Sequence, residues 1–229
     1  MVPIHDAHEH SPHPPGLARQ FEDLQQQLDA SVLGMWLFLI TEIMFFGGLF
    51  AGYAIYRSGA PDAFAAASGH LDIALGGFNT VVLIFSSLTM ALAVRSAQLG
   101  NNKAIFNYLV ATLVLGTVFL VVKGFEYHDK FVHHLIPGAN FQWPDPALAR
   151  GAEMFYCFYF AMTGMHAFHM IIGAGLLIYF LIQARKQRYH SEYYGPVEIM
   201  GLYWHFVDIV WIFLFPLLYL LGLHLPGKH

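Results

Sequence analysis

Ionisable side chains stand inside apolar stretches of this chain, where few such groups are expected. Glu42 lies within the apolar stretch that begins at Leu33, among several phenylalanines. A charge at the centre of a bilayer costs about 2.5–3.5 kcal/mol on insertion scales, so such groups normally face protein or water. The position leaves two interpretations open, a buried structural hydrogen bond to a neighbouring helix or a carboxyl that exchanges protons or acts in gating.

Histidines and carboxylates share helix faces near the end of the chain. His166 and His169 are three residues apart, so on a helix they project from one face. Glu198 and His205 are seven residues apart, and Asp208 lies one turn further. The pattern is compatible with a polar network between two helices, a proton relay, or a metal or haem site. We expect the network, with no catalytic residue and no bound metal.

The composition indicates where these residues lie. Of the 229 residues, 57% are apolar and only 11% are charged, whereas a soluble domain carries about 25% charged residues. A formal net charge of −4 argues against nucleic-acid binding, which needs a basic face. The single cysteine excludes a disulfide framework and any site that takes two thiolates from this chain. We therefore predict an integral membrane protein.

Five stretches are long and apolar enough to cross a hydrocarbon core about 30 Å thick, which takes about 20 helical residues. The short alternating segments typical of a β-barrel are not visible. We predict an all-α membrane protein with one domain, a bundle of five transmembrane helices. The predicted spans cover residues 33–56, 73–94, 105–122, 154–182 and 199–223.

The flanks and connections predict the topology. Residues 1–32 form a His/Pro-rich tail with a short surface helix over 17–30, and residues 224–229 form a short C-terminal tail. The short connections 95–104 and 183–198 are basic, which favours a cytoplasmic N-terminus and a periplasmic C-terminus. A histidine-rich tail can hold a soft divalent metal, but we expect a disordered tail without one. These histidines are His5, His8, His10 and His13.

Small and polar residues predict where the helices pack, because close approach and interhelical hydrogen bonds hold helices together in lipid. The first span has small residues at a spacing of seven and a Gly-x-x-x-Gly pair. The second span has two polar residues seven apart, and the fourth has a glycine one heptad beyond its first histidine. These positions are Gly34, Thr41, Gly48 and Gly52, then Asn79 and Ser86, then Gly173.

Several motifs resemble the subunit III family of haem-copper oxidases. The run GLYWHFVDIVWIFLF at 201–215 resembles the last helix of that family, and WLFLITEIMFF at 36–46 resembles the helix that carries its buried glutamate. The long form of the family has seven helices, whereas this chain resembles the short form with five. Further motifs follow in the expected order, namely Asn79-Thr80 with Ser86-Ser87, Phe125-Glu126-Tyr127, and His166-x-x-His169-x-x-x-Gly173.

The resemblance implies an accessory, non-redox subunit of a respiratory terminal oxidase of the cytochrome c oxidase type. Such a subunit packs directly on catalytic subunit I, which carries the haems and copper, in a complex with subunit II. It supports proton uptake and turnover stability while oxygen is reduced to water, and it binds phospholipid. By resemblance, Glu42 matches the buried carboxyl, Glu198 the glutamate before the YWHFVD motif, His205 and Asp208 that motif, and His166 and His169 the histidine pair.

Other functions stay open at the level of the sequence. One is the equivalent subunit of a quinol oxidase or a nitric oxide reductase. Another is a membrane cytochrome with haem b between His169 and His205, and a third is a transporter that uses Glu42. A transporter would be expected to show inverted repeats or broken helices, and neither is visible. The expected location is the inner membrane of a bacterium, with no nucleic-acid partner.

Overall fold

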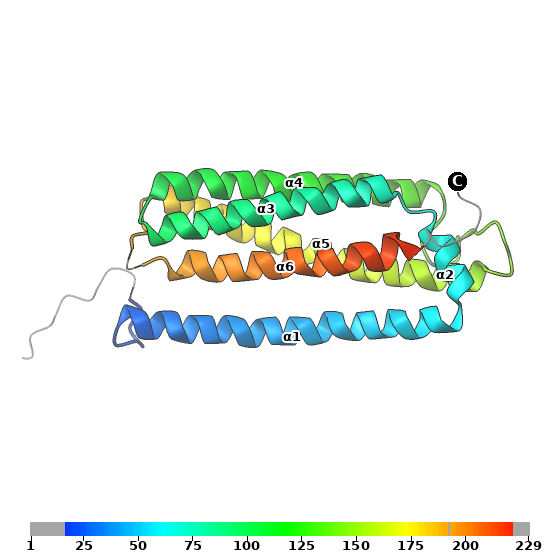
Figure 1. The fold of residues 1–229 in the computed structure, drawn as a ribbon, viewed down its shortest axis with the longest axis horizontal. Coiled ribbons are helices and arrows are strands. Elements are labelled where there is room, and N and C mark those ends of the chain that lie inside the picture. Colours follow the sequence, from blue (N-terminus) through cyan, green and yellow to red (C-terminus); the bar gives the residue numbers. More distant parts are fainter. Residues whose placement is uncertain (1–16, 192, 222–229) are drawn as a thin grey trace, which may run out of the picture.

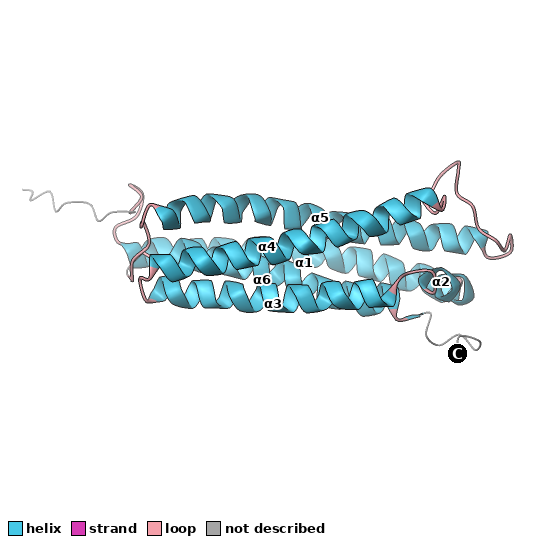
Figure 2. Ribbon diagram, turned by 90° about the horizontal axis from the view of Figure 1, so that it is seen from above, coloured by secondary structure: helices cyan, strands magenta, loops and turns pink. Residues whose placement is uncertain are grey.

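The computed structural model describes residues 17–191 and 193–221, and its regular elements are all helices. The long helices run along one axis, and the short helix α2 lies at one end of the bundle (Figures 1 and 2). The N-terminal histidines and the predicted C-terminal tail lie outside the described residues. The helices are α1 (Leu24–Gly59), α2 (Pro61–Ser68), α3 (Ile73–Gln98), α4 (Asn102–Val132), α5 (Ala149–Arg185) and α6 (Gly195–Tyr219).

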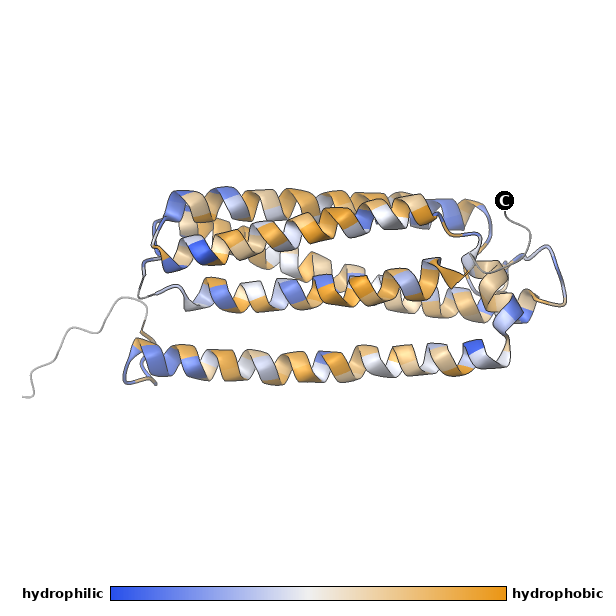
Figure 3. Cartoon of the chain, in the orientation of Figure 1, coloured by the Kyte–Doolittle hydropathy of each residue, from blue (hydrophilic) through white to orange (hydrophobic). Residues whose placement is uncertain are grey.

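Five of the six helices are long and apolar enough to cross a membrane, which confirms the predicted all-α bundle. Apolar residues occupy the middle of these helices and hydrophilic residues gather toward both ends (Figure 3). Because five helices run from one end of the bundle to the other, the described chain begins and ends at opposite ends (Figure 1). Backbone groups in lipid must be bonded within the segment, and a helix does this by itself.

Helices α1 and α4 extend furthest beyond their predicted spans. The surface helix expected over 17–30 is not separate, because α1 runs unbroken for 36 residues after Asp23 caps its first turn by accepting from the Gln26 amide at 2.7 Å. Helix α4 continues to Val132 instead of ending at residue 122. Helix α2 was not predicted, and it starts with Pro61 in the first turn, where proline is favoured.

Helix α6 is the most buried span, and α1 is the least. Helix α6 packs against α3, α5 and α1, and 56% of its most apolar window is buried, against 11% for α1. Figure 1 shows α1 at one edge of the bundle, beside α6 and on the side opposite to α3 and α4. Most of the apolar surface of α1 therefore faces out of this chain.

The indole of Trp204 fills a space between glycines of two other helices. A Cβ on Gly173 of α5 would lie 2.8 Å from the Trp204 ring, and one on Gly116 of α4 would lie 3.0 Å from it. The indole Nε1 donates to the Ser86 hydroxyl of α3 at 2.9 Å. One side chain of α6 thus contacts α3, α4 and α5, at two of the positions predicted for packing.

The predicted seam of small residues in the first span does not pack within the described chain. A Cβ on Gly34 or Gly48 would meet nothing within 4 Å, and Thr41 is exposed and bonds only within its own helix, at the Phe38 carbonyl. The buried face of α1 instead carries bulky residues, which also repeat every seven positions. They are offset from the small residues by two positions, or about 200° of rotation, so the two sets lie on nearly opposite faces of the helix. These buried residues are Leu39, Phe46 and Tyr53.

The remaining packing positions lie inside the bundle. Gly52 faces α5, where a Cβ would lie 3.3 Å from the Phe158 ring. Asn79 is fully buried, and its side-chain amide makes no hydrogen bond within the described residues.

Candidate functional site

A carboxyl–imidazole pair joins the edge helix α1 to α5 inside the membrane-spanning region. Oε2 of Glu42 lies 3.2 Å from Nε2 of His169, and both side chains are largely buried. Nδ1 of His169 lies 2.9 Å from the Met165 carbonyl oxygen. A carbonyl oxygen only accepts, so Nδ1 carries a hydrogen and Nε2 is left to share a proton with the Glu42 carboxyl.

Neighbouring groups on two helices hold His169 in this position. The Tyr203 hydroxyl of α6 donates to the His169 carbonyl oxygen at 2.9 Å. The ring of Phe46, one turn after Glu42 on α1, packs against the imidazole with ring centres 5.6 Å apart. The imidazole thus sits between α1 and its own helix, where its only ionisable neighbour at hydrogen-bonding distance among the described residues is Glu42.

The other predicted polar residues make separate contacts instead of one network. His166 is fully buried, and its Nε2 donates to the Val207 carbonyl oxygen of α6 at 3.0 Å. Glu198 lies in the first turn of α6, where the helix dipole favours a carboxylate.

His205 and Asp208 belong to the side of α6 that faces α3. Nδ1 of His205 lies 2.7 Å from the Ser87 hydroxyl of α3. Asp208 is buried one turn later, and the same Ser87 hydroxyl lies beside its carboxyl, with no other hydrogen-bonding partner within the described residues. The two histidines of α5 and the one of α6 therefore point to three different partners.

A buried ion pair in the extended part of α4 was missed by sequence reasoning. Lys123 and Glu126 are 4% and 3% exposed, and Lys123 Nζ donates to Glu126 Oε2 at 2.9 Å. Lys123 also donates to the hydroxyls of Tyr219 at 2.8 Å and Tyr159 at 3.3 Å. Both tyrosines in turn donate to Glu126 Oε1. The cluster ties α4 to α5 and α6, and every charged atom in it has partners, as a buried pair requires.

The signal for this cluster was present in the spacing. Lys123, Glu126 and Lys130 lie three and four residues apart and so share one helix face. All three are buried, and Lys130 at the end of α4 donates to the His70 carbonyl oxygen and to Asp129, each at 3.0 Å. The predicted span ended at residue 122, immediately before Lys123, and so did not include these three residues.

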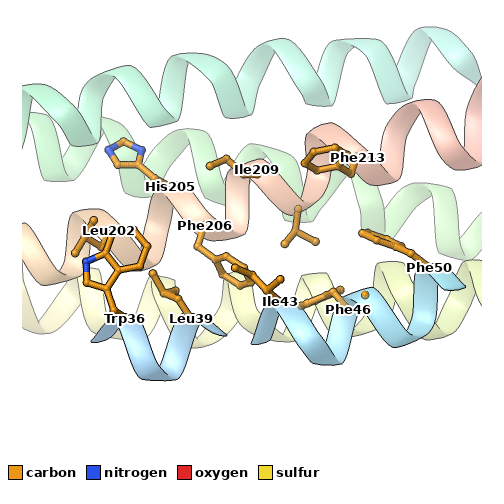
Figure 4. Close-up of a pocket in the computed structure, with 12 residues that line it drawn as sticks. Trp36, Leu39, Ile43, Phe46, Phe50, Leu202, His205, Phe206, Ile209 and Phe213 are labelled. Carbon is orange, nitrogen blue, oxygen red and sulfur yellow. The ribbon is translucent and has the colours of Figure 1, made fainter. Parts of the chain in front are cut away.

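An apolar groove runs between α1 and α6 next to the carboxyl–imidazole pair. It has a volume of about 490 Å³, and Figure 4 shows side chains of the two helices pointing toward each other across it. Its one ionisable lining residue is His205. Within residues 17–191 and 193–221, no three His, Cys, Asp or Glu side chains lie close enough to hold a metal ion.

The sequence matches the family described as cytochrome c oxidase subunit III over residues 25–223, which includes all five spans. The chain belongs to that family. This confirms the resemblance seen in the sequence motifs. It also makes the protein a subunit III of a haem-copper oxidase, of either the cytochrome c or the quinol type.

Relatives of both types are similar to this subunit III. The quinol oxidase subunit 3 of Bacillus spizizenii is 33% identical over 84% of this chain and 88% of its own length. The cytochrome c oxidase subunit 3 of Synechocystis is 32% identical over 94% and 80%, and that of Alkalihalophilus pseudofirmus is 32% identical over 83% and 86%. Together with the five apolar helices, these relatives confirm a multi-pass protein of a bacterial inner membrane.

Proposed function

We propose that this subunit III packs directly on subunit I, beside subunit II, and supports proton uptake and turnover stability without carrying a redox centre. The observation that carries the proposal is the Glu42–His169 pair. The 3.2 Å contact between Glu42 Oε2 and His169 Nε2 lies in the middle of two apolar helices. A titratable pair at this depth is costly unless it has a function or a strong structural need.

We propose that the pair takes up and releases protons. Because His169 Nδ1 already donates to the Met165 carbonyl, the shared position between Nε2 and Oε2 holds one proton in the neutral pair. Uptake of a second proton leaves an imidazolium beside a neutral acid, and release returns the neutral pair. We propose that the pair buffers protons beside the uptake pathway of subunit I.

The apolar groove between α1 and α6 is proposed to hold an acyl chain of a bound phospholipid. Its walls are aromatic and aliphatic side chains from both helices (Figure 4). Helix α1 has little contact of its own with the bundle, so an acyl chain in the groove would fill space between α1 and α6. The function proposed for this lipid is to hold α1, and with it Glu42, in place.

The proposed orientation keeps the N-terminus in the cytoplasm, as the basic short connections predict. The end of the bundle that carries α2 and the loop after α4 then faces the periplasm (Figure 1). The equivalent role in a quinol oxidase is the alternative, since relatives of the two types match this chain at 33% and 32% identity.

Isolation of the complex in mild detergent through a tag on this chain tests the proposal. We expect a haem-containing subunit I and subunit II to be recovered with it in equal amounts, and no Soret band on the chain once it is separated from them. Recovery of the chain alone from membranes that contain the oxidase would contradict the proposal. So would a haem spectrum that stays with the separated chain.

A further inference from the structure

A second cavity flanks α6 on the side away from α1. It lies between α3 and α6 and has a volume of about 370 Å³. Ser87, His205 and Asp208 line it, and the rest of its wall is aliphatic or alanine. His205 and Ile209 line both this cavity and the groove toward α1. The two hollows thus lie on either side of a ridge formed by α6.

His205 is the polar group that this ridge presents. Its Nδ1 is held by the Ser87 hydroxyl at 2.7 Å, which orients the ring. The side chain is only partly buried, and its Nε2 makes no hydrogen bond within the described residues. Asp208 follows one turn later, buried, with the Ser87 hydroxyl beside its carboxyl and no other hydrogen-bonding partner in the described chain. The cavity therefore brings two incompletely satisfied polar groups together.

The depth of these groups decides what can satisfy them. His205 is the eleventh of the 25 residues of α6, so at a rise of about 1.5 Å per residue it lies roughly 15 Å from one helix end and roughly 21 Å from the other. The hydrocarbon core is about 30 Å thick. At that depth a lipid offers only its acyl chain, which has no hydrogen-bonding atom, whereas a transmembrane helix can present a polar side chain.

We propose that the cavity between α3 and α6 receives a transmembrane helix of another oxidase subunit, and that a neutral polar side chain of this helix hydrogen-bonds His205 in the middle of the membrane. The aliphatic rim supplies the apolar packing surface, since Ile84, Leu88, Ile209 and Ile212 are each about half exposed. A neutral partner such as serine, threonine, asparagine or tyrosine avoids the cost of a buried charge. The inference rests on the proposed packing of this subunit III on other oxidase subunits. It adds that the face between α3 and α6 makes that contact.

Photo-cross-linking in the intact complex tests the face. p-Benzoylphenylalanine replaces Ile212, on the cavity wall, or Ile171 of α5, which is similarly exposed but lines neither hollow. We expect irradiation to join the Ile212 variant to another oxidase subunit, with at least a several-fold higher yield than the Ile171 variant. Adducts at Ile212 with lipid alone, with a second copy of this chain, or in no higher yield than at Ile171 would overturn the inference.

A retention experiment tests the hydrogen bond. We expect His205→Leu to reduce the fraction of this chain recovered with the oxidase several-fold after a detergent wash, and His205→Gln, which keeps a hydrogen-bonding group, to restore most of it. Ile212→Trp, which fills the cavity without removing a polar atom and does not line the groove toward α1, should also reduce recovery, while Ile171→Trp should not. Equal recovery of all four variants, with the wild-type complex intact, would overturn the inference and leave the proposed function standing. Failure of the wild-type chain to co-purify would overturn the proposed function instead.

Discussion

The carboxyl of Glu42 on α1 lies 3.2 Å from the imidazole of His169 on α5, although the two residues are far apart in the chain. The pair connects the least buried span to the centre of the bundle. It is also the place where a largely buried carboxyl faces a ring nitrogen of a histidine. A structural contact and the proposed proton-handling function therefore fall on the same two residues, and substitutions must separate them.

Glu42→Gln keeps the size of the side chain and a polar group beside His169 but replaces the carboxyl by an amide, which is not ionisable. We expect an assembled oxidase with a normal haem spectrum, whose number of turnovers before inactivation falls several-fold or whose proton uptake slows. Glu153→Gln is the matched control, because Glu153 bonds only the Gly138 amide at the bundle surface. Identical proton uptake and lifetime in wild type and Glu42→Gln would make Glu42 purely structural.

Lys123→Met leaves the Glu126 carboxylate buried without its cation. Breaking a buried pair by removing one partner costs about 3–5 kcal/mol, whereas replacing both partners by apolar residues is often close to neutral. We therefore expect Lys123→Met to lower the unfolding temperature in detergent more than the double variant Lys123→Met/Glu126→Leu does. Thermal unfolding followed by circular dichroism measures both. A double variant less stable than the single one would show that the tyrosines, and not the charge, depend on Glu126.

Gly173→Ala places a methyl group against the Trp204 ring, 2.8 Å from its nearest atom. Overpacking of a tight interior costs about 1–3 kcal/mol, so we expect a lower unfolding temperature. Gly175→Ala on the same helix is the control, because its Cβ would meet nothing within 4 Å. That change should be neutral or slightly stabilising, since alanine favours a helix over glycine by about 1 kcal/mol. Equal effects at the two positions would argue against the packing of Trp204 on Gly173.

Gly47→Leu fills the apolar groove between α1 and α6 without a clash, because Gly47 lines the groove and a Cβ there meets nothing within 4 Å. We expect the purified complex to lose about one bound phospholipid per subunit III, measured by mass spectrometry of extracted lipids. Gly175→Leu adds the same bulk to α5 at a position that lines no groove described above. Equal lipid content in the two variants would count against an acyl chain in this groove.

The membrane fold was predictable because the apolar stretches, as helices rising about 1.5 Å per residue, come close to or exceed the roughly 30 Å thickness of the hydrocarbon core. The end of α4 was not, since the burial of Lys123 depends on Glu126 and on tyrosines that α5 and α6 bring to it. An average of hydropathy over a window of residues places the end of the span at that lysine. Only the spacing of the charges that follow it indicated a continuing helix.

The sequence predicted which polar residues share a helix face but not which residues they contact. Helical spacing placed His166 and His169 on one face, yet their partners lie on different helices, and α1 supplies the carboxyl. The seam of small residues on α1 failed as a packing prediction within this chain for a similar reason. Small residues permit close approach, but Leu39 and its heptad partners, about half a turn away, form the buried face.

Comparison of the oxidase with and without this chain tests the accessory role most directly. Subunit III is removed by detergent or omitted by gene deletion, and haem content, initial turnover rate and number of turnovers before inactivation are measured on both forms. We expect equal haem content and a largely retained initial rate, with a several-fold smaller number of turnovers in the form that lacks subunit III. Loss of haem together with the chain, or an unchanged number of turnovers, would contradict the accessory role.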